Sequence, residues 1–128
     1  MAVMKILAIA ALLVAAVSAA GVVKLTADNF NEIVKDPSKN VFVKFYAPWC
    51  GHCTRMAPAW EELAKNQADN ADVVIAELDA DAHRSTAQDF GVRGFPTIKL
   101  FTKTNKNGKD YQGARDVNSF NNFLKANL

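Results

Sequence analysis

Two cysteines three positions apart are the residues of this chain whose type and spacing most directly offer chemistry. They are the only cysteines among 128 residues, and they stand in the segment FYAPWCGHC, with Gly51 and His52 between Cys50 and Cys53. Such a pair could brace the fold as a structural disulfide, form half of a metal site, or react as a dithiol that exchanges electrons with other proteins. The elements around the pair decide how each sulfur behaves.

Apolar patterning on both sides of the cysteines predicts a sheet covered by helices. The segment from Val41 to Ala47 is nearly continuous apolar sequence, as expected of a central strand buried on both faces. Asp72 to Asp79 is a second buried strand, and Asn107-Gly108 is a strong hairpin signal. Further strands are expected at 22–25, in GFPTIKLF and near Tyr111, and helices around 30–34, from about 50, before 90 and after 116. The order β-α-β-α-β-α-β-β-α predicts an α/β domain with a central mixed β-sheet flanked by helices.

The helix predicted at the cysteines gives the two sulfurs different surroundings. Cys50 falls at the helix start, where unpaired backbone N–H groups and the positive end of the helix dipole favour a thiolate. Cys53, one turn later, opens an apolar stripe that continues with Met56 and Trp60, and it should be buried. His52 adds a dipole or, when protonated, a charge that favours the same thiolate. We therefore expect Cys50 to be the accessible, more acidic nucleophile and Cys53 to be the shielded resolving thiol.

A metal site and a structural disulfide fit the cysteine pair less well. Zinc takes about four ligands, and the chain offers two cysteines plus His52 and His83, without a second paired cluster. A bridge between Cys50 and Cys53 closes a ring of only about four residues, for which the loop-entropy model gives about 1.9 kcal/mol, against about 3 kcal/mol for fifteen residues. No metal is expected, and a redox-active dithiol is the favoured interpretation.

The segment FYAPWCGHC resembles the active-site segment of protein disulfide isomerases. The similarity extends from about Val22 to Leu124 and is most specific at residues 45–53 and in GVRGFPTIKLF. It implies a single catalytic domain of the thioredoxin fold, in which Cys50-Gly51-His52-Cys53 is the redox centre. Ordinary thioredoxins have proline where His52 stands. The isomerases are the more oxidising of the two groups, so the resemblance implies oxidation and rearrangement of disulfides rather than their reduction.

The same resemblance implies roles for residues outside the motif. Pro96 corresponds to the cis-proline of the family, which faces the dithiol, and the backbone of Phe95 would pair with an extended substrate strand. Trp49 and Phe95 would give this groove an apolar lining suited to unfolded clients; the alternative is that both are only core side chains. Arg115 corresponds to a family arginine that approaches the buried cysteine and assists its ionisation.

Lys44 is the main departure from the family pattern. Most relatives carry a buried acid six residues before the first cysteine, which is thought to take the proton from the resolving thiol. Here a lysine interrupts the most apolar strand. Lys44 could be buried with a lowered pKa and act as a base, stay charged and favour the thiolates, or extend its ammonium group to water. A role in tuning the sulfurs is the favoured hypothesis.

The first twenty residues are typical of a cleaved signal peptide. Lys5 precedes an apolar run from Ile6 to Val17, and Ser18-Ala19-Ala20 is a small-residue exit. We expect residues 1–20 to be removed and residues 21–128 to form one thioredoxin-like catalytic domain with no membrane anchor. A membrane-spanning helix is the weaker alternative, because the run is short and alanine-rich.

Charge and the chain end bear on partners and location. The formal net charge is +2 and no basic block occurs, so nucleic acid is not an expected partner. A signal peptide leads to compartments where disulfides persist, and the resemblance implies the lumen of the endoplasmic reticulum. The last residues, FLKANL, are not a Lys-Asp-Glu-Leu type retrieval signal, which leaves export open. Expected partners are unfolded or partly oxidised client proteins, with glutathione or an oxidase as electron partner.

Three functions follow, of which the first is favoured. It is a thiol–disulfide oxidoreductase, a protein disulfide isomerase, that needs no cofactor because the cysteine pair itself carries the electrons. The second is a thioredoxin-like protein disulfide reductase, which the equilibrium of the dithiol with glutathione would separate from the first. The third is a chaperone-like binding module in which the redox pair is incidental.

Overall fold

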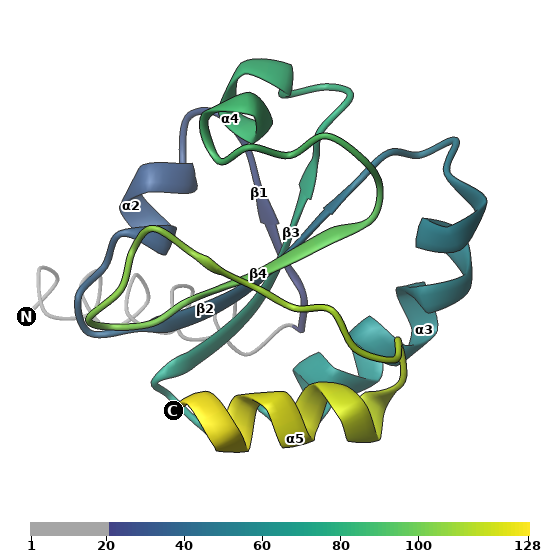
Figure 1. Cartoon of the computed structure of the whole chain (residues 1–128). Helices are drawn as coiled ribbons and strands as arrows, with labels where there is room; N and C mark the ends of the chain where they lie inside the picture. Colours follow the sequence, from purple (N-terminus) through teal and green to yellow (C-terminus); the bar gives the residue numbers. More distant parts are fainter. Residues whose placement is uncertain (1–20) are drawn as a thin grey trace, which may run out of the picture.

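A five-stranded mixed sheet forms the middle of the molecule (Figure 1). The computed structural model describes residues 21–128, and the predicted signal peptide, residues 1–20, lies outside the described residues. Along the described chain the elements follow the predicted order: β1 (Val23–Leu25), α2 (Phe30–Val34), β2 (Asn40–Tyr46), α3 (Gly51–Asn66), β3 (Val73–Asp79), α4 (Arg84–Asp89), β4 (Thr97–Phe101), β5 (Lys109–Asp110) and α5 (Val117–Asn127).

The strands lie in the order β1-β3-β2-β4-β5 across the sheet. Strand β3 is parallel to β1 and β2, whereas β4 is antiparallel to β2 and β5. The early parallel crossovers and the late hairpin therefore give the mixed sheet that the element order predicts. Strand β2 is central and pairs with a strand on each side. This pairing fixes the end of β2 from which the chain continues to the cysteines.

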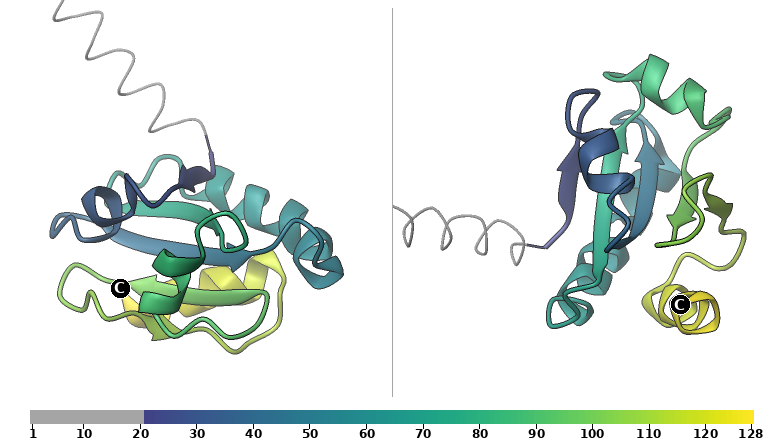
Figure 2. Two further views of the ribbon diagram at one scale, coloured as in Figure 1. Left: turned by 90° about the horizontal axis from the view of Figure 1, so that it is seen from above. Right: turned by 90° about the vertical axis from the view of Figure 1, so that its left-hand side faces the viewer.

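Helices cover both faces of this sheet, and each face has its own apolar core (Figure 2). Helices α2 and α4 share one core, which contains Phe30 and Phe45. Helices α3 and α5 share the other, which contains Trp60, Phe120 and Phe42. Phe42 and Phe45 lie on opposite faces because side chains alternate along a strand. Within residues 21–128, no helix is both long and apolar enough to cross a membrane.

Helix α3 carries the second cysteine on its buried face. Its buried side chains are those of the predicted apolar stripe, Cys53, Met56, Trp60, Leu63 and Ala64. Trp60 is fully buried, and its Nε1–H donates a hydrogen bond of 3.0 Å to the carbonyl oxygen of Ala76 in β3. This contact and the stripe fix the rotation of α3 on the sheet, and with it the direction of the Cys53 sulfur.

The hairpin between β4 and β5 turns at Asn107-Gly108, as predicted. Gly108 has φ +90°, and a Cβ at this position would lie 2.9 Å from the ring of Phe101, so no other residue fits without a shift. Strand β5 is shorter and ends earlier than the strand expected near Tyr111. Tyr111 follows β5; its N–H donates to the carbonyl oxygen of Ile98 at 2.9 Å, and its ring packs in the core beneath α3 and α5.

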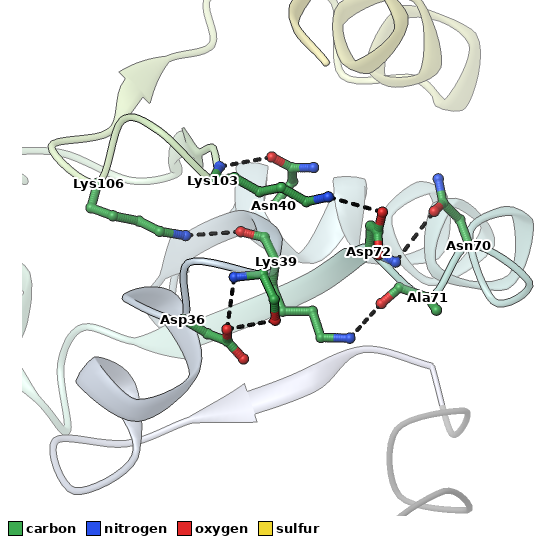
Figure 3. Close-up of polar contacts among 9 residues, drawn as sticks. Asp36, Lys39, Asn40, Asn70, Ala71, Asp72, Lys103 and Lys106 are labelled. Carbon is green, nitrogen blue, oxygen red and sulfur yellow. Dashed lines mark hydrogen bonds and ion pairs between the residues drawn. The ribbon is translucent and has the colours of Figure 1, made fainter.

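Lysine side chains tie three loops together at the end of the sheet opposite the cysteines (Figure 3). Lys39 Nζ donates to the carbonyl oxygen of Ala71 at 2.6 Å, and Lys106 Nζ donates to the carbonyl oxygen of Lys39 at 2.8 Å. Lys103 Nζ pairs with Asp72 Oδ2 at 2.9 Å. These residues precede β2, precede β3 and follow β4, so the network closes this end of the sheet.

The two tryptophans give a matched test of this packing. Trp60→Phe removes the hydrogen bond to Ala76 and part of a fully buried ring, and we expect it to lower the free energy of unfolding by about 1–3 kcal/mol. Trp49→Phe, at a position 69% exposed, should change it by less than about 0.5 kcal/mol. Urea unfolding of the reduced protein measures both. Equal effects at the two positions would contradict the assignment of Trp60 to the core.

Candidate active site

The sulfur of Cys50 caps the N-terminus of α3. Cys50 has an extended backbone (φ −85°, ψ 115°), and its Sγ accepts a hydrogen bond of 3.3 Å from the N–H of Cys53. Its N–H donates to the carbonyl oxygen of Ala47 at 3.1 Å, and its own carbonyl oxygen accepts from the N–H of Thr54 at 3.1 Å. A side chain at this position usually satisfies the first unpaired N–H groups of a helix. Here the group that does so is the predicted nucleophile.

The two cysteines differ less in exposure than the sequence predicts. Both are free thiols, and the exposed fraction is 7% for Cys50 and 3% for Cys53. Cys53 is buried, as expected from its place in the stripe, but Cys50 is buried as well. The reason is that Ala47 lies in one cluster with both sulfurs, and Tyr46 and Phe95 pack against that cluster. The asymmetry of the pair therefore lies in acidity rather than in access.

Hydrogen bonds lower the pKa of Cys50 below its usual value of 9.0. Burial is the largest single influence and acts in the opposite direction, since it raises the pKa of this thiol. Hydrogen bonds to the sulfur from the Cys53 thiol and from the N–H groups of Cys53 and His52 outweigh it, and the charge of Arg115 adds to them. The direction agrees with the thiolate predicted at the helix start.

Burial raises the pKa of Cys53 to about 11. The hydrogen bond from its thiol to Cys50 and the negative charge of the Cys50 thiolate act in the same direction. A hydrogen bond from the backbone of Ala47 and the positive charge of Lys44 oppose them. Cys53 thus keeps its proton at pH values where a substantial fraction of Cys50 is ionised, and the two thiols of the pair are chemically distinct.

His52 influences Cys50 through its backbone. Both Gly51 and His52 are exposed, and the His52 ring contacts Arg55, with Nη2 of the guanidinium 2.6 Å from the ring Nδ1. A guanidinium group only donates hydrogen bonds, so the ring of His52 is the acceptor in this contact. Arg55 was not singled out from the sequence, although its spacing of three residues along a helix is the signal for such a contact.

The peptide bond between Phe95 and Pro96 is cis, as the resemblance implies. Phe95 packs against the cluster of the two cysteines, so this turn lies beside the dithiol. Trp49 lies edge-on to Phe95, with 5.7 Å between the ring centroids, and is 69% exposed. A hollow of about 220 Å³ is lined by both rings, with Val92 among the other apolar residues. An indole this exposed is not a core side chain, which rules out the alternative for Trp49.

Arg115 lies on the surface and lines a second hollow, of about 490 Å³, together with Arg93 and Pro96. The resemblance implies an approach to the buried cysteine. In this structure the charge of Arg115 contributes to lowering the pKa of Cys50. Arg115 is therefore close enough to act on the cysteine pair, and its approach to Cys53 stays a prediction.

Lys44 is buried and paired. Its residue is 4% exposed, and its Nζ lies 3.5 Å from Oε1 of Glu77 on the neighbouring strand β3. The ammonium group also lies 5.2 Å from the centre of the Tyr46 ring. The ammonium group therefore does not extend to water, and this one of the three alternatives is wrong. Instead, the carboxylate of Glu77 is the partner of the buried charge. Glu77 was not singled out from the sequence.

No metal site emerges around the cysteines in residues 21–128, where no three His, Cys, Asp or Glu side chains lie close enough to share an ion. His83, the second histidine weighed as a ligand, has a separate contact. Its Nδ1 accepts a hydrogen bond of 3.4 Å from the N–H of Ala27, in the loop that leads into α2.

Comparison with known proteins places the chain in a family. Residues 21–126 match the thioredoxin family. The chain is 50% identical over 103 residues to protein disulfide isomerase-like 2-1 of Oryza sativa subsp. japonica, an alignment that covers 80% of this chain and 28% of the relative. It is 51% identical over 101 residues to protein disulfide-isomerase A2 of Mus musculus, covering 78% of this chain and 19% of the relative.

A solved structure agrees in fold and sequence. The first thioredoxin domain of mouse protein disulfide-isomerase A4 superposes with a TM-score of 0.70 at 35% identity, covering 80% of this chain and 72% of that domain. The chain spans less than a third of the length of the two curated relatives named above. The predicted thioredoxin fold is confirmed, and the chain belongs to the thioredoxin family, as a domain of the protein disulfide isomerase type.

Proposed function

We propose that this chain is a thiol–disulfide oxidoreductase that forms and rearranges disulfides in client proteins through Cys50 and Cys53. The observation that carries the proposal is the position of the Cys50 sulfur at the N-terminus of α3, where it accepts a hydrogen bond of 3.3 Å from the N–H of Cys53. In agreement with this position, the pKa of Cys50 is lowered, whereas burial raises that of Cys53 to about 11. One sulfur is ready to attack, while the other stays protonated until it is needed. The family of the chain supports the same reaction class.

The reaction consists of two exchanges at sulfur. In the oxidising direction, a client thiolate attacks Cys50 of the Cys50–Cys53 disulfide, a client–Cys50 bond forms, and Cys53 leaves as a thiolate that takes up a proton. A second client thiolate then attacks the client sulfur of this mixed disulfide, so that the client disulfide forms and Cys50 leaves as its stabilised thiolate. The client loses two electrons and the cysteine pair gains them, so no other cofactor is proposed.

Return to the disulfide form needs an oxidant. We propose glutathione disulfide or a protein oxidase, either of which exchanges with Cys50 in the same way and leaves with two electrons. Since a lowered pKa stabilises the reduced pair, the disulfide form is the better oxidant. This favours client oxidation over the thioredoxin-like reductase, and equilibration of the pair with glutathione buffers measures the difference directly.

The surface beside the dithiol suits an extended, partly unfolded client. Trp49 and Phe95 present apolar area next to Cys50, and the Phe95 backbone makes no hydrogen bond with the backbone of the described residues. We propose that a client strand pairs with this backbone while its cysteine meets Cys50. Unfolded clients of this kind occur in the lumen of the endoplasmic reticulum, where we place the activity; fractionation of cells and medium separates residence there from export.

Alkylation tests the asymmetry of the pair. We expect iodoacetamide to label Cys50 of the reduced protein at pH values below 9.0, because its lowered pKa leaves thiolate present, and to label Cys53 only as the pH approaches about 11. Peptide mapping by mass spectrometry identifies the labelled site at each pH. Equal labelling of both cysteines near neutrality, at the rate of a free cysteine, would exclude the proposed roles.

Serine variants test the order of attack. Cys53→Ser should accumulate a mixed disulfide between Cys50 and a client peptide, because the thiol that resolves it is gone, whereas Cys50→Ser should form none. Non-reducing electrophoresis after acid quenching measures both. The double variant should lose oxidase activity completely. Retention of full function by the double variant would favour the chaperone-like binding module instead.

Trp49→Ala tests the client surface. We expect KM for an unfolded peptide substrate to rise about 2- to 10-fold, the loss of one aromatic contact of about 0.5–1.5 kcal/mol, with no change for a small dithiol. Trp49→Phe is the matched control and should keep most of the affinity. A loss that is equal for the peptide and the small dithiol would mean that Trp49 acts on the sulfur and not on the client.

A further inference from the structure

Among residues 21–128, the ion pair between Lys44 and Glu77 is more buried on both sides than the others, and the proposed reaction leaves it without a task. The side chains are 5% and 16% exposed, respectively. Lys44 of β2 stands in direct register with Glu77 of β3, so both project from the same face of the sheet. Burial of a charged pair in this position costs solvation energy, whereas burial of an apolar pair would not. The presence of the charges therefore suggests that they have a role other than stability.

This pair lies on the face that carries Cys53. Lys44 has the same side-chain direction as Phe42, two residues earlier, which packs beneath α3 and α5. Lys44 is nearer the end of β2 that leads to the cysteines, and Ile98 of β4 lies beside it in register. The positive charge of Lys44 acts on Cys53, where it lowers the pKa of the thiol against the effect of burial. The ammonium group is therefore close enough for its charge to influence the resolving thiol.

Glu77 is what fixes the ammonium group in this position. A lysine 4% exposed is stable in its charged form only with a partner, and Glu77 Oε1 at 3.5 Å is the carboxylate that pairs with it. Without that carboxylate, nothing would offset the cost of burying the ammonium group, and the lysine side chain would turn toward water. That movement takes the cation away from Cys53.

Other titratable groups also face this pair. Tyr46 of β2 lies 5.2 Å from the Lys44 ammonium group, and burial, followed by the charges of Glu77 and Asp79, raises its pKa. From α3, the buried thiol of Cys53 is the group on which the charge of Lys44 acts. On the far side of Glu77, exposed Lys24 of β1 is its partner in register. Glu77 thus lies between two lysines, of which the buried one makes the ion pair.

We propose that Glu77 is a positioning residue for the resolving thiol: it holds the Lys44 ammonium group near Cys53, and this fixed positive charge stabilises the Cys53 thiolate whenever that thiolate forms. The inference rests on the proposed function for its place in the reaction. It assigns Glu77 a task through Lys44, without contact to the client.

The step concerned is the escape from a mixed disulfide. The Cys53 thiol gives its proton to solvent, and its sulfur attacks Sγ of Cys50. The Cys50–Cys53 bond forms, the bond between Cys50 and the client sulfur breaks, and the client leaves as a thiolate that takes up a proton. Over the two exchanges that lead from the reduced pair to the Cys50–Cys53 disulfide, the pair loses two electrons and the client disulfide gains them. In the reverse direction the same charge stabilises Cys53 as the leaving thiolate.

The direction in which Glu77→Gln changes the rate of the resolving step distinguishes two possible roles of Glu77. If Glu77 acted only through its own negative charge, its removal would favour the Cys53 thiolate and speed the resolving step. If it acts by holding Lys44, removal should slow this step about tenfold at neutral pH, the change in thiolate fraction for one pKa unit. Quenched-flow decay of a mixed disulfide between Cys50 and a peptide measures the rate over a range of pH.

Companion variants complete the experiment. Lys44→Met should slow the step to the same extent, and Glu77→Gln should have no further effect in that background, because both act through one charge. Lys44→Arg keeps the positive charge, so the rate of the resolving step should stay near that of the unchanged protein. Should Glu77→Gln fail to fold, Glu77→Asp, which retains the charge but withdraws it, should give an intermediate rate. Asp72→Asn, which breaks the Lys103 pair at the opposite end of the sheet (Figure 3), is the matched control and should leave the rate unchanged.

Titration of Cys53 by thiolate absorbance in a Cys50→Ser background separates this inference from the proposed function. It needs no client, and Glu77→Gln should move the titration of Cys53 to higher pH there as well. A resolving step that is faster or unchanged in Glu77→Gln, or a Cys53 titration that does not move, overturns the assignment. Absence of any mixed disulfide in the unchanged protein overturns the proposed function, while the titration still decides the role of Glu77.

Discussion

The hydrogen bond from the N–H of Cys53 to the sulfur of Cys50 joins the fold of this domain to its chemistry. A helix must satisfy the first of its N–H groups, and most helices use a serine, threonine, asparagine or aspartate oxygen for this purpose. In α3 the capping atom is a thiol sulfur, which accepts hydrogen bonds better as a thiolate. Folding of the helix and ionisation of Cys50 therefore favour each other. Everything that fixes the start of α3, from the central place of β2 to the buried face of Trp60, fixes the reactive sulfur too.

Burial raises the pKa of both cysteine thiols, and different groups oppose this effect at each of them. At Cys50 the N–H groups of the helix start and the charge of Arg115 outweigh the cost of burial. At Cys53 burial prevails, although a hydrogen bond from the backbone of Ala47 and the positive charge of Lys44 in β2 oppose it. The sheet and the helix thus act on different sulfurs. This division lets one pair of adjacent cysteines contain a thiolate and a thiol at the same pH.

Features encoded within one element could be predicted from the sequence, and features that depend on how elements meet could not. The apolar run of β2 and the apolar stripe of α3 can be recognised in the sequence, because the hydrophobic pattern along one segment is enough to predict a strand or a helix. The ion partner of Lys44 is hidden in the sequence, because only the parallel register of β2 and β3 brings Glu77 beside it. The burial of Cys50 was missed for the same reason, since Phe95, which helps cover it, comes from a loop more than forty residues later. The cis bond at Pro96 was expected only through family resemblance.

The contrasting environments of the two tryptophans supply the molecule with two intrinsic reporters. Trp60 is sealed in the core and hydrogen-bonded to β3, so its emission follows the integrity of the sheet–helix packing. Trp49 stands in solvent immediately before the first cysteine, so its emission is sensitive to sulfur quenching and to anything that settles on the surface beside it. Loss of the core packing should therefore change the fluorescence emission of Trp60, whereas a reaction or a bound molecule at the dithiol should change that of Trp49. No attached dye is needed to tell the two apart.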